Sequence, residues 1–331
     1  PVLVSAELWG RHFYAGEKLP VRVCIVNDSD GGRALGECLL RWQIEDSCGT
    51  VLTKGAMDTA PVEHYGRLWL EPDIVLPQIA SAREEVRLRL KLFENGCPLS
   101  ENEYELLLAT DGYPETDRLD GMQFQALAPV PELDALGVEY TLVDGLQDAH
   151  SGAVVCLCCD SEEDASSVRD FIDGGGSVLF LGTAELAKAV FPEHIRDIIS
   201  PTEGDICFME RSDDSVFDGI GELELRYFND NTRSIPLACR HTLRVNRSDS
   251  LKELAGQMKI HAYIDGSTQQ DRLERIDAMR GLTLFEVRSG KGRALVSTMC
   301  TDKAATDPVA ARLLANMLLS ISMPESPEQS L

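Results

Sequence analysis

The chain has 331 residues, enough for two domains of ordinary size, and its 44% hydrophobic and 26% charged residues are typical of a folded soluble protein. Asp and Glu total 55 against 31 Lys and Arg, and the net charge of −24 argues against binding to nucleic-acid phosphates. No apolar run approaches the roughly 20 residues of a membrane-spanning helix, and Pro1 to Leu8 lacks the pattern of a secretory signal.

Residues 1–112 alternate polar and apolar side chains in short runs, the period of a strand with one buried face. The clearest run is Glu85–Phe93, in which Val86, Leu88 and Leu90 share one face. Asn, Asp and Gly residues that favour turns separate the runs. About seven short strands without a helical pattern predict two packed antiparallel sheets, an immunoglobulin-like β-sandwich.

Trp42 lies in the middle of the predicted strand Cys38–Ile44, where immunoglobulin-like sandwiches often bury a tryptophan. The inter-sheet disulfide of such domains is not predicted here. Cys24 finds no cysteine partner on the run Glu85–Phe93, and Cys97 follows that run in a turn. We therefore expect the sandwich to depend on apolar packing.

The same part of the chain carries several aromatic residues with two possible roles. Flat rings pack against the faces of sugars, so Trp9, Tyr14 and Trp69 are the candidates for contact with a carbohydrate. Packing in the core and at sheet edges is the other interpretation, and we favour it.

Residues 113–121 are polar and rich in turn formers, and we expect a linker there. Over residues 122–323, strands and helices alternate, which predicts a three-layer α/β domain of the flavodoxin-like or amidotransferase-like kind. The strands expected in its first part are 138–143, 153–159 and 177–181. The helices expected are 131–136, one that begins at Asp160–Ser161, 184–190 and 192–199.

The remainder of this domain is less regular. Strands are expected at 206–209, 223–228 and 261–264, and a hairpin is expected with strands 283–287 and 294–298. Asp307 followed by Pro308 predicts the start of a C-terminal helix, because proline is favoured at the first helical position. Residues 324–331 are expected to form a frayed polar tail.

The ten cysteines lack the spacing of zinc ligands, and Cys156, Cys158 and Cys159 lie in an apolar run as small buried hydrophobes would. Neither a metal site nor a cofactor is predicted. Free thiols in a core are typical of a reducing, cytoplasmic setting. Gly174–Gly176 and Gly290–Gly292 lack the strand–loop–helix order of a phosphate loop, so both are interpreted as turns.

An α/β enzyme often carries its nucleophile on the sharp turn between a strand and a helix. The turn after strand 177–181 is Gly182-Thr183-Ala184, which contains neither Cys nor Ser. No neighbouring His or Lys in the sequence is placed to activate Thr183. The six histidines are scattered, and a glycosidase pair cannot be chosen among so many carboxylates, so no catalytic residue is predicted.

The first part of the chain resembles a known family. Three runs, Phe13–Asn27, Leu40–Asp46 and Gly49–Leu52, resemble the β-sandwich that follows the catalytic barrel in some family 2 glycoside hydrolases, β-galactosidase-like enzymes included. The similarity extends over most of the chain, and the order of the two domains is its stronger part.

The second half resembles the class I glutamine-amidotransferase-like domain that some of those glycosidases append. The stretches that carry this resemblance are Phe171–Phe180, Phe285–Arg293 and Asp307–Leu318. The amidotransferase nucleophile, a cysteine, has no counterpart at the Gly182-Thr183-Ala184 turn. The chain also lacks a (β/α)8 barrel, which needs about 250 residues by itself, so the two catalytic glutamates of the glycosidases have no counterpart either.

The resemblance therefore implies a non-catalytic, accessory C-terminal region of a glycosidase that hydrolyses β-glycosidic bonds. Its partner would be a catalytic barrel upstream in the same polypeptide, and the region could also support a homo-oligomer. A carbohydrate-binding module is the alternative, and an independent hydrolase or amidotransferase ranks last.

Overall fold

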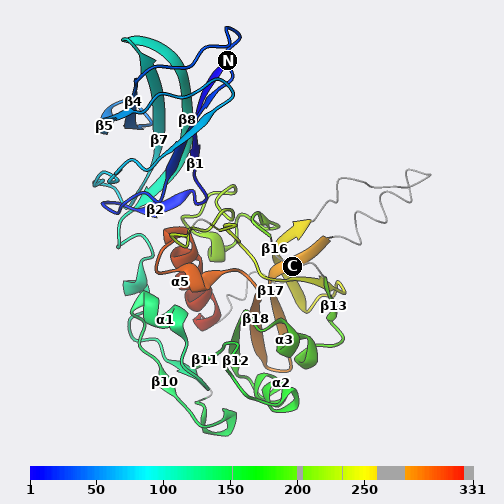
Figure 1. Ribbon diagram of the computed structural model, residues 1–331. Coiled ribbons are helices and arrows are strands. Elements are labelled where there is room, and N and C mark those ends of the chain that lie inside the picture. Colours follow the sequence, from blue (N-terminus) through cyan, green and yellow to red (C-terminus); the bar gives the residue numbers. More distant parts are fainter. Residues whose placement is uncertain (151, 200–203, 233, 259–279, 324–331) are drawn as a thin grey trace, which may run out of the picture. The chain divides into compact units, whose positions relative to one another are not determined.

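The computed structural model describes residues 1–150, 152–199, 204–232, 234–258 and 280–323 of the chain. The protein is multi-domain and rich in β-structure, and it divides into two compact units (Figure 1). Unit 1 consists of Pro1–Tyr113 with two short later segments, Asn229–Pro236 and Thr306–Pro308. Unit 2 contains the rest of the chain from Pro114 onward.

Unit 1 contains two sheets that enclose one apolar core. The three-stranded sheet is antiparallel and has the order β1 (Val2–Glu7), β3 (Arg22–Asn27), β6 (Arg67–Leu70). The five-stranded sheet has the order β2 (His12–Tyr14), β8 (Cys97–Ala109), β7 (Arg83–Glu94), β4 (Cys38–Asp46), β5 (Val51–Thr59). In this sheet β2 runs parallel to β8, and the other pairs are antiparallel.

The alternation expected around residues 85–93 is confirmed on β7. Val86, Leu88 and Leu90 are buried in the core between the sheets, whereas Arg87 on the same strand is exposed. Trp42 lies mid-strand on β4 as expected and is partly buried.

Its indole ring lies over Gly55 of the paired strand β5, where an added Cβ atom would come within 2.1 Å of the ring. A glycine at this position therefore leaves the space that the Trp42 ring fills.

The last residue of β7, Glu94, lies at a buried position of the strand's alternation, and its carboxylate side chain is only 10% exposed. The Arg33 guanidinium donates to both of its carboxylate oxygens, at 3.0 and 2.6 Å, and the Gly36 amide donates to Oε1 at 2.8 Å. These hydrogen bonds, above all those from Arg33, lower the pKa of Glu94 from 4.5 to about 2. A charge at an inward position is tolerated because it is fully hydrogen-bonded.

A buried polar network joins the three segments of unit 1. The Nδ1 atom of His12, on β2, lies 3.1 Å from Oδ2 of Asp307, and both side chains are almost fully buried. The backbone amide of Asn229 donates to the same Asp307 oxygen at 2.7 Å. Thr306 Oγ1 donates to the Asn229 carbonyl at 2.7 Å. The sandwich therefore includes polar contacts supplied by residues far along the chain.

Unit 2 is built on a mixed sheet of ten strands. Five neighbouring strands are parallel and have the order β10 (Thr141–Leu142), β9 (Phe124–Ala126), β11 (Val154–Leu157), β12 (Ser177–Leu181), β18 (Gly292–Ser297). The sheet continues with the antiparallel strands β17 (Arg280–Ser289), β15 (Thr242–Val245) and β13 (Ile195–Ile199). Strand β16 (Leu251–Met258) pairs with β17 and with the short β14 (Phe208–Met209).

The helices of unit 2 lie mainly between the parallel strands in the sequence. They are α1 (Pro131–Leu136), α2 (Ala165–Asp173), α3 (Ala184–Val190) and α5 (Pro308–Ser322, of which Pro308 is assigned to unit 1). The described residues also contain four short 3-10 helices, η1 (Thr116–Leu119), η2 (Leu146–Asp148), η3 (Ser215–Phe217) and η4 (Thr301–Lys303). The segment 113–121, expected as a linker, thus contains η1.

Several expected elements differ from the structure. The helix predicted over 192–199 is wrong, because Ile195–Ile199 forms strand β13, which pairs with β15. Helix α2 begins after Asp164, whose side chain accepts from the Ser167 amide, and not at Asp160–Ser161. Residues 223–228 form turns and one isolated bridge instead of a strand. The strand expected at 261–264 lies outside the described residues.

Two glycine turns, both considered above as phosphate loops, pack against each other. An added Cβ atom on Gly292 would lie 2.2 Å from the Ile172 carbonyl oxygen and 2.3 Å from that of Gly176. Across the same contact the Arg293 amide donates to the Gly176 carbonyl at 3.2 Å. These glycines therefore serve a close backbone approach between the α2–β12 turn and the β17–β18 turn.

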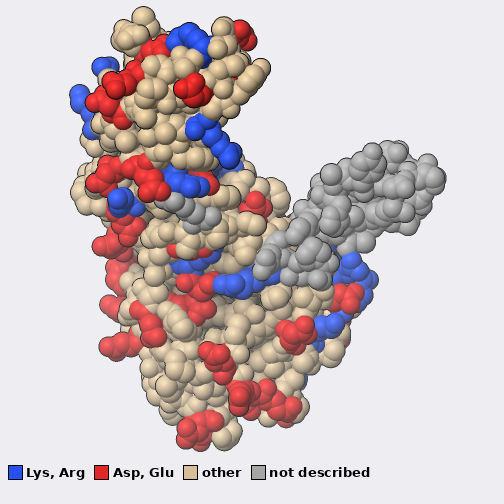
Figure 2. Space-filling model, viewed as in Figure 1, with Lys and Arg blue, Asp and Glu red and all other residues tan. Residues whose placement is uncertain are grey.

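Asp and Glu side chains are spread over the face seen in Figure 2, with Lys and Arg among them, so the negative charge is dispersed there. Among the described residues, no helix combines the length and the apolar character needed to cross a membrane.

We expect Glu94→Gln to lower the free energy of unfolding at neutral pH by on the order of 1 kcal/mol, because Arg33 is half exposed and solvent screens the pair. The pKa of Glu94 is lowered in the folded state, so its contribution is present above pH 4.5 and is lost as the pH falls toward about 2. The difference between the variant and the original chain should shrink over that range.

Urea unfolding at a series of pH values measures this difference. Glu101→Gln, which removes a half-exposed partner of Lys91 on β8, is the matched control and should change little. A deficit of Glu94→Gln that stays constant from neutral to acid pH would contradict the assignment.

Candidate functional site

The five parallel strands of unit 2 direct their carboxyl ends to one edge of the sheet, where β11, β12 and β18 can be followed in Figure 1. Numbered among themselves along the chain, these strands have the spatial order 2-1-3-4-5. The direction of strand order reverses beside β9, between β9 and β11. Open α/β sheets bind ligands outside the carboxyl ends of the strands at such a reversal, so this edge is the first candidate site.

Sulfur atoms connect the loops at this edge. Cys158 Sγ donates to the Pro129 carbonyl at 3.4 Å, which links the loop after β11 to the loop after β9. The exposed Cys159 has its Sγ atom 3.9 Å from the Gly182 carbonyl, at the end of β12. The sequence placed these two thiols in one apolar run, and in the structure Cys158 is buried but Cys159 is not.

Three charged residues lie near these thiols. Arg240 donates to Asp302 of η4 at 2.5 Å. Burial raises the pKa of Glu132 on α1, and the nearby Asp302 carboxylate raises it further, while Arg240 opposes the shift. A carboxyl group with a raised pKa could act as a proton donor, but only if a reacting group lies beside it.

The turn between β12 and α3 is the strand-to-helix position at which an α/β enzyme often carries its nucleophile. Gly182 adopts a left-handed conformation with φ 69°, and Thr183 follows it. The Thr183 hydroxyl is buried and has no hydrogen-bond partner in the described part of the chain. No described base therefore contacts it, and the hydroxyl is not activated for attack.

The thiols near this edge are also held in their neutral form. Burial raises the pKa of Cys156 and of Cys300 to about 12. Burial also raises the pKa of Cys159, and the neighbouring Cys158 adds to the shift. The thiolate is the nucleophilic form of cysteine, so none of these three side chains is poised for nucleophilic attack.

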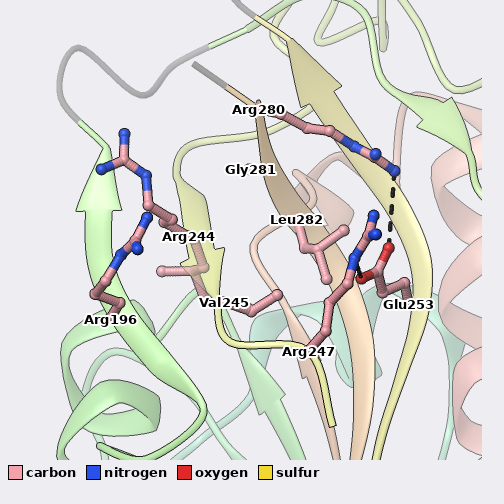
Figure 3. Close-up of a pocket in the computed structure, with 9 residues that line it drawn as sticks. Arg196, Arg244, Val245, Arg247, Glu253, Arg280, Gly281 and Leu282 are labelled. Atoms are coloured by element: carbon pink, nitrogen blue, oxygen red, sulfur yellow. Dashed lines mark hydrogen bonds and ion pairs between the residues drawn. The ribbon is translucent and has the colours of Figure 1, made fainter. Parts of the chain in front are cut away.

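A second candidate site is a hollow of about 240 Å³ in the antiparallel half of the sheet (Figure 3). Its lining residues are Arg196 on β13, Leu243, Arg244 and Val245 on β15, Arg247 after β15, Glu253 on β16, and Arg280, Gly281 and Leu282 on β17. The hollow thus combines four guanidinium groups with an apolar floor.

Carboxylates pair with these guanidinium groups. Glu253 lies 2.9 Å from Arg247 and 3.7 Å from Arg280. Glu210 lies 2.6 Å from Arg280. Among the described residues, no three metal-ligating side chains gather here or elsewhere into a cation site.

The three aromatic residues predicted to contact sugar lie on different elements. Tyr14 is on β2 in the five-stranded sheet, and burial raises its pKa. Trp9 precedes β2, and its indole nitrogen is buried without a hydrogen-bond partner in the described structure. Trp69 is on β6 in the three-stranded sheet and is 41% exposed. The structure therefore assigns Tyr14 and Trp69 to different sheets.

Sequence reasoning missed the four arginines because it did not predict β15 and assigned β13 to a helix. A signal was present in Thr242-Leu-Arg-Val-Asn-Arg247, where apolar and basic residues alternate as on a strand. Sequence reasoning also missed Glu132, Arg240 and Asp302. These lie far apart in the sequence, and only the fold brings them to one edge.

No family model matches the chain, and no curated protein matches its sequence. Solved structures with some similarity include a calcium-binding mutant of Bacteroides uniformis beta-glucuronidase 2, at 12% identity and a TM-score of 0.23, with 54% of this chain covered. A glycosyl hydrolase family 2 member from Bacteroides cellulosilyticus is similar at 10% identity and a TM-score of 0.26, with 58% covered. The periplasmic chaperone SfaE is similar at 14% identity and a TM-score of 0.22, with 37% of this chain covered.

The chain spans 23% and 38% of the two glycosidase chains and 65% of the chaperone. These neighbours belong to different functional classes, and at such TM-scores the similarities do not decide the function.

We expect iodoacetamide at about pH 8 to label the exposed Cys48 and Cys97 before Cys159, because the pKa of the Cys159 thiol is raised although it is exposed. Cys156 and Cys300 should react only on unfolding. Time-resolved peptide mass spectrometry gives the five rates. Faster labelling of Cys159 than of Cys48 and Cys97 would identify a thiolate at the carboxyl edge and restore it as a candidate nucleophile.

Proposed function

We propose that this chain is a non-catalytic accessory region of a glycoside hydrolase of the family 2, β-galactosidase-like kind, with its catalytic barrel upstream in the same polypeptide. The observation that carries the proposal is the elbow between β12 and α3. It is the strand-to-helix turn at which a nucleophile would be expected, but the Thr183 hydroxyl has no described partner to activate it. The neutral thiols around the elbow do not replace it.

The architecture agrees with this proposal at two points. The parallel strands of unit 2 have the 2-1-3-4-5 order of flavodoxin-like sheets, the arrangement expected for an amidotransferase-like domain. Unit 1 is a two-sheet sandwich that precedes most of unit 2 in the sequence, the domain order on which the resemblance depends.

In an accessory region the two units would act by binding to other parts of the protein. They would brace the barrel, shape the rim of its active site or support a homo-oligomer. None of these roles needs a reacting side chain in this chain. The unactivated elbow would then be an inherited backbone feature without chemical use.

The elbow offers a direct test, because threonine and valine have nearly the same shape. Thr183→Val removes a buried hydroxyl without a described partner, so we expect the free energy of unfolding to stay the same or rise by about 1 kcal/mol. In the parent enzyme kcat/KM on nitrophenyl β-glycosides should be unchanged. The present chain alone should not turn over these substrates.

Thr183→Ser is the matched control, because it keeps the hydroxyl and removes one methyl group. Loss of parent activity in Thr183→Val with retention in Thr183→Ser would show that the hydroxyl takes part in chemistry. That result, or turnover by the present chain, would overturn the accessory assignment.

A carbohydrate-binding sandwich is the second candidate, and the exposed indole of Trp69 favours it. The Arg22 guanidinium lies 4.6 Å from the centre of this ring. The Nε atom of Arg22 donates to Oε2 of Glu7 at 2.5 Å. A sugar that stacks on the same face of the ring would have to displace Arg22. The charged pair would then offer hydrogen bonds to its hydroxyl groups.

For this candidate, calorimetry with β-linked oligosaccharides at millimolar concentration should show heat of binding that Trp69→Ala abolishes. Tyr65→Ala is the control, because Tyr65 is exposed near the start of β6 but is not paired with Arg22. The absence of heat with the unaltered chain would exclude this candidate and leave the accessory proposal untouched.

A further inference from the structure

One edge of the five-stranded sheet in unit 1 is a long strand. Strand β5 pairs only with β4 and lies at the end of the strand order (Figure 1). It has nine residues and contains no proline. On the side away from β4, the backbone of residues 53–58 has no hydrogen-bond partner among the described residues. An edge of this kind is a template on which another extended segment can pair.

The regular part of β5 has a defined centre. The pairing of β5 with β4 is irregular next to Val51 and is regular from Thr53 to Thr59. Ala56 is the middle residue of this regular part. Two copies of the strand could therefore pair antiparallel about a twofold axis at Ala56, and the whole regular part would take part in the pairing.

Opposite charges meet in this register. Lys54 and Asp58 are both exposed on the outer face of the sheet, because the alternate residue Met57 points inward and packs against the core. Neither has an ion-pair partner within the described part of the chain. In the twofold pair each Lys54 would lie directly opposite Asp58 of the second copy, so two symmetric ion pairs would form.

Other registers of the same pair are less favourable. A displacement of two residues places Lys54 or Asp58 opposite Ala56 and removes both ion pairs. A displacement of four residues places Lys54 opposite Lys54 in one direction and Asp58 opposite Asp58 in the other. Like charges directly opposite each other destabilise a strand pair. The charges therefore select the register centred on Ala56.

The inner face of the pair fits the same register. Gly55 would lie opposite Met57 of the second copy, so a long side chain meets a position without one. The Trp42 indole lies over Gly55. Met57 of the second copy would therefore approach this indole, and a thioether sulfur makes favourable contacts with aromatic rings.

We propose that β5 is a self-association surface, on which a second copy of this chain pairs antiparallel through residues 53–59 about a twofold axis at Ala56. The two five-stranded sheets then form one continuous sheet, and the interface uses the same patch on both copies, as twofold dimers do. The inference goes beyond the accessory role, because it concerns an edge of unit 1 and not the chemistry of a parent enzyme. Where the accessory proposal holds, it names the surface that supports the homo-oligomer.

Sedimentation velocity of the chain over a range of concentrations tests the proposal. We expect a reversible dimer with a Kd on the order of 100 µM or lower, because one strand pair gives a small interface. Lys54→Glu and Asp58→Lys should each weaken the dimer about tenfold, since each places like charges opposite each other at two symmetric positions. The double variant Lys54→Glu/Asp58→Lys restores opposite charges and should restore the dimer. Arg87→Glu, which reverses an exposed charge on the central strand β7, is the matched control and should leave the dimer unchanged.

Hydrogen exchange locates the interface, because amides of residues 53–59 that point away from β4 should exchange more slowly as the chain concentration rises. Protection that appears elsewhere but not on β5 would overturn the proposal. So would a dimer that both single charge reversals leave intact, or a double variant that does not recover. A chain that stays monomeric at about ten times the expected Kd would overturn it as well. That last result would leave the edge to an extended segment of another protein, and it would not affect the accessory proposal, which turnover of glycosides tests separately.

Discussion

The architecture of unit 2 depends on one close backbone contact, between the turn after α2 and the turn that joins β17 to β18. Carbonyl oxygens of Ile172 and Gly176 occupy the space in which a side chain at position 292 would lie. Only glycine permits this approach, because backbone atoms cannot move aside as a flexible side chain can. The contact brings β18 beside β12, although the two strands are far apart in the sequence.

From β18 the sheet continues through β17 to β15 and β13, so both candidate sites depend on this contact. The two sites differ in their physical chemistry. At the carboxyl edge of the parallel strands, burial favours the neutral forms of Glu132 and of the thiols. In the antiparallel half the ionised groups remain paired near solvent. The carboxyl edge, where the topology predicts a ligand, therefore holds no activated nucleophile among the described residues. The paired charged groups lie instead on and beside the antiparallel strands β13, β15, β16 and β17.

Part of this arrangement could be predicted from the sequence. Strand β7 shows a strict period of two, and its inward residues are buried as expected. Helix α5 begins at Pro308 as predicted, because its starting signal is local. Sequence patterns did not predict the correct element where a strand pairs with a partner that is far away in the sequence. Ile195 to Ile199 has an apolar spacing that also suits a helix, and pairing with β15 makes it a strand.

The candidate sites were harder to predict for the same reason. Thr183 was found from the sequence because the elbow is a local turn, but the absence of a described hydrogen-bond partner depends on the fold. Arg196 and Arg244 are separated by a long stretch of chain, and their proximity follows from the register of β13 and β15. Trp9, Tyr14 and Trp69 were grouped by residue type alone, which carries no information on which sheet holds each ring.

The buried pair of His12 and Asp307 has a consequence for the synthesis of the protein. The ribosome makes the strands of the sandwich before most of unit 2, but the carboxylate that meets His12 emerges only after most of unit 2 has been made. Until then, the native contact between His12 and Asp307 cannot form. The sandwich therefore completes its native contacts after translation has passed through the other unit. A gene fragment that ends at residue 113 would encode its strands without this part of its interior.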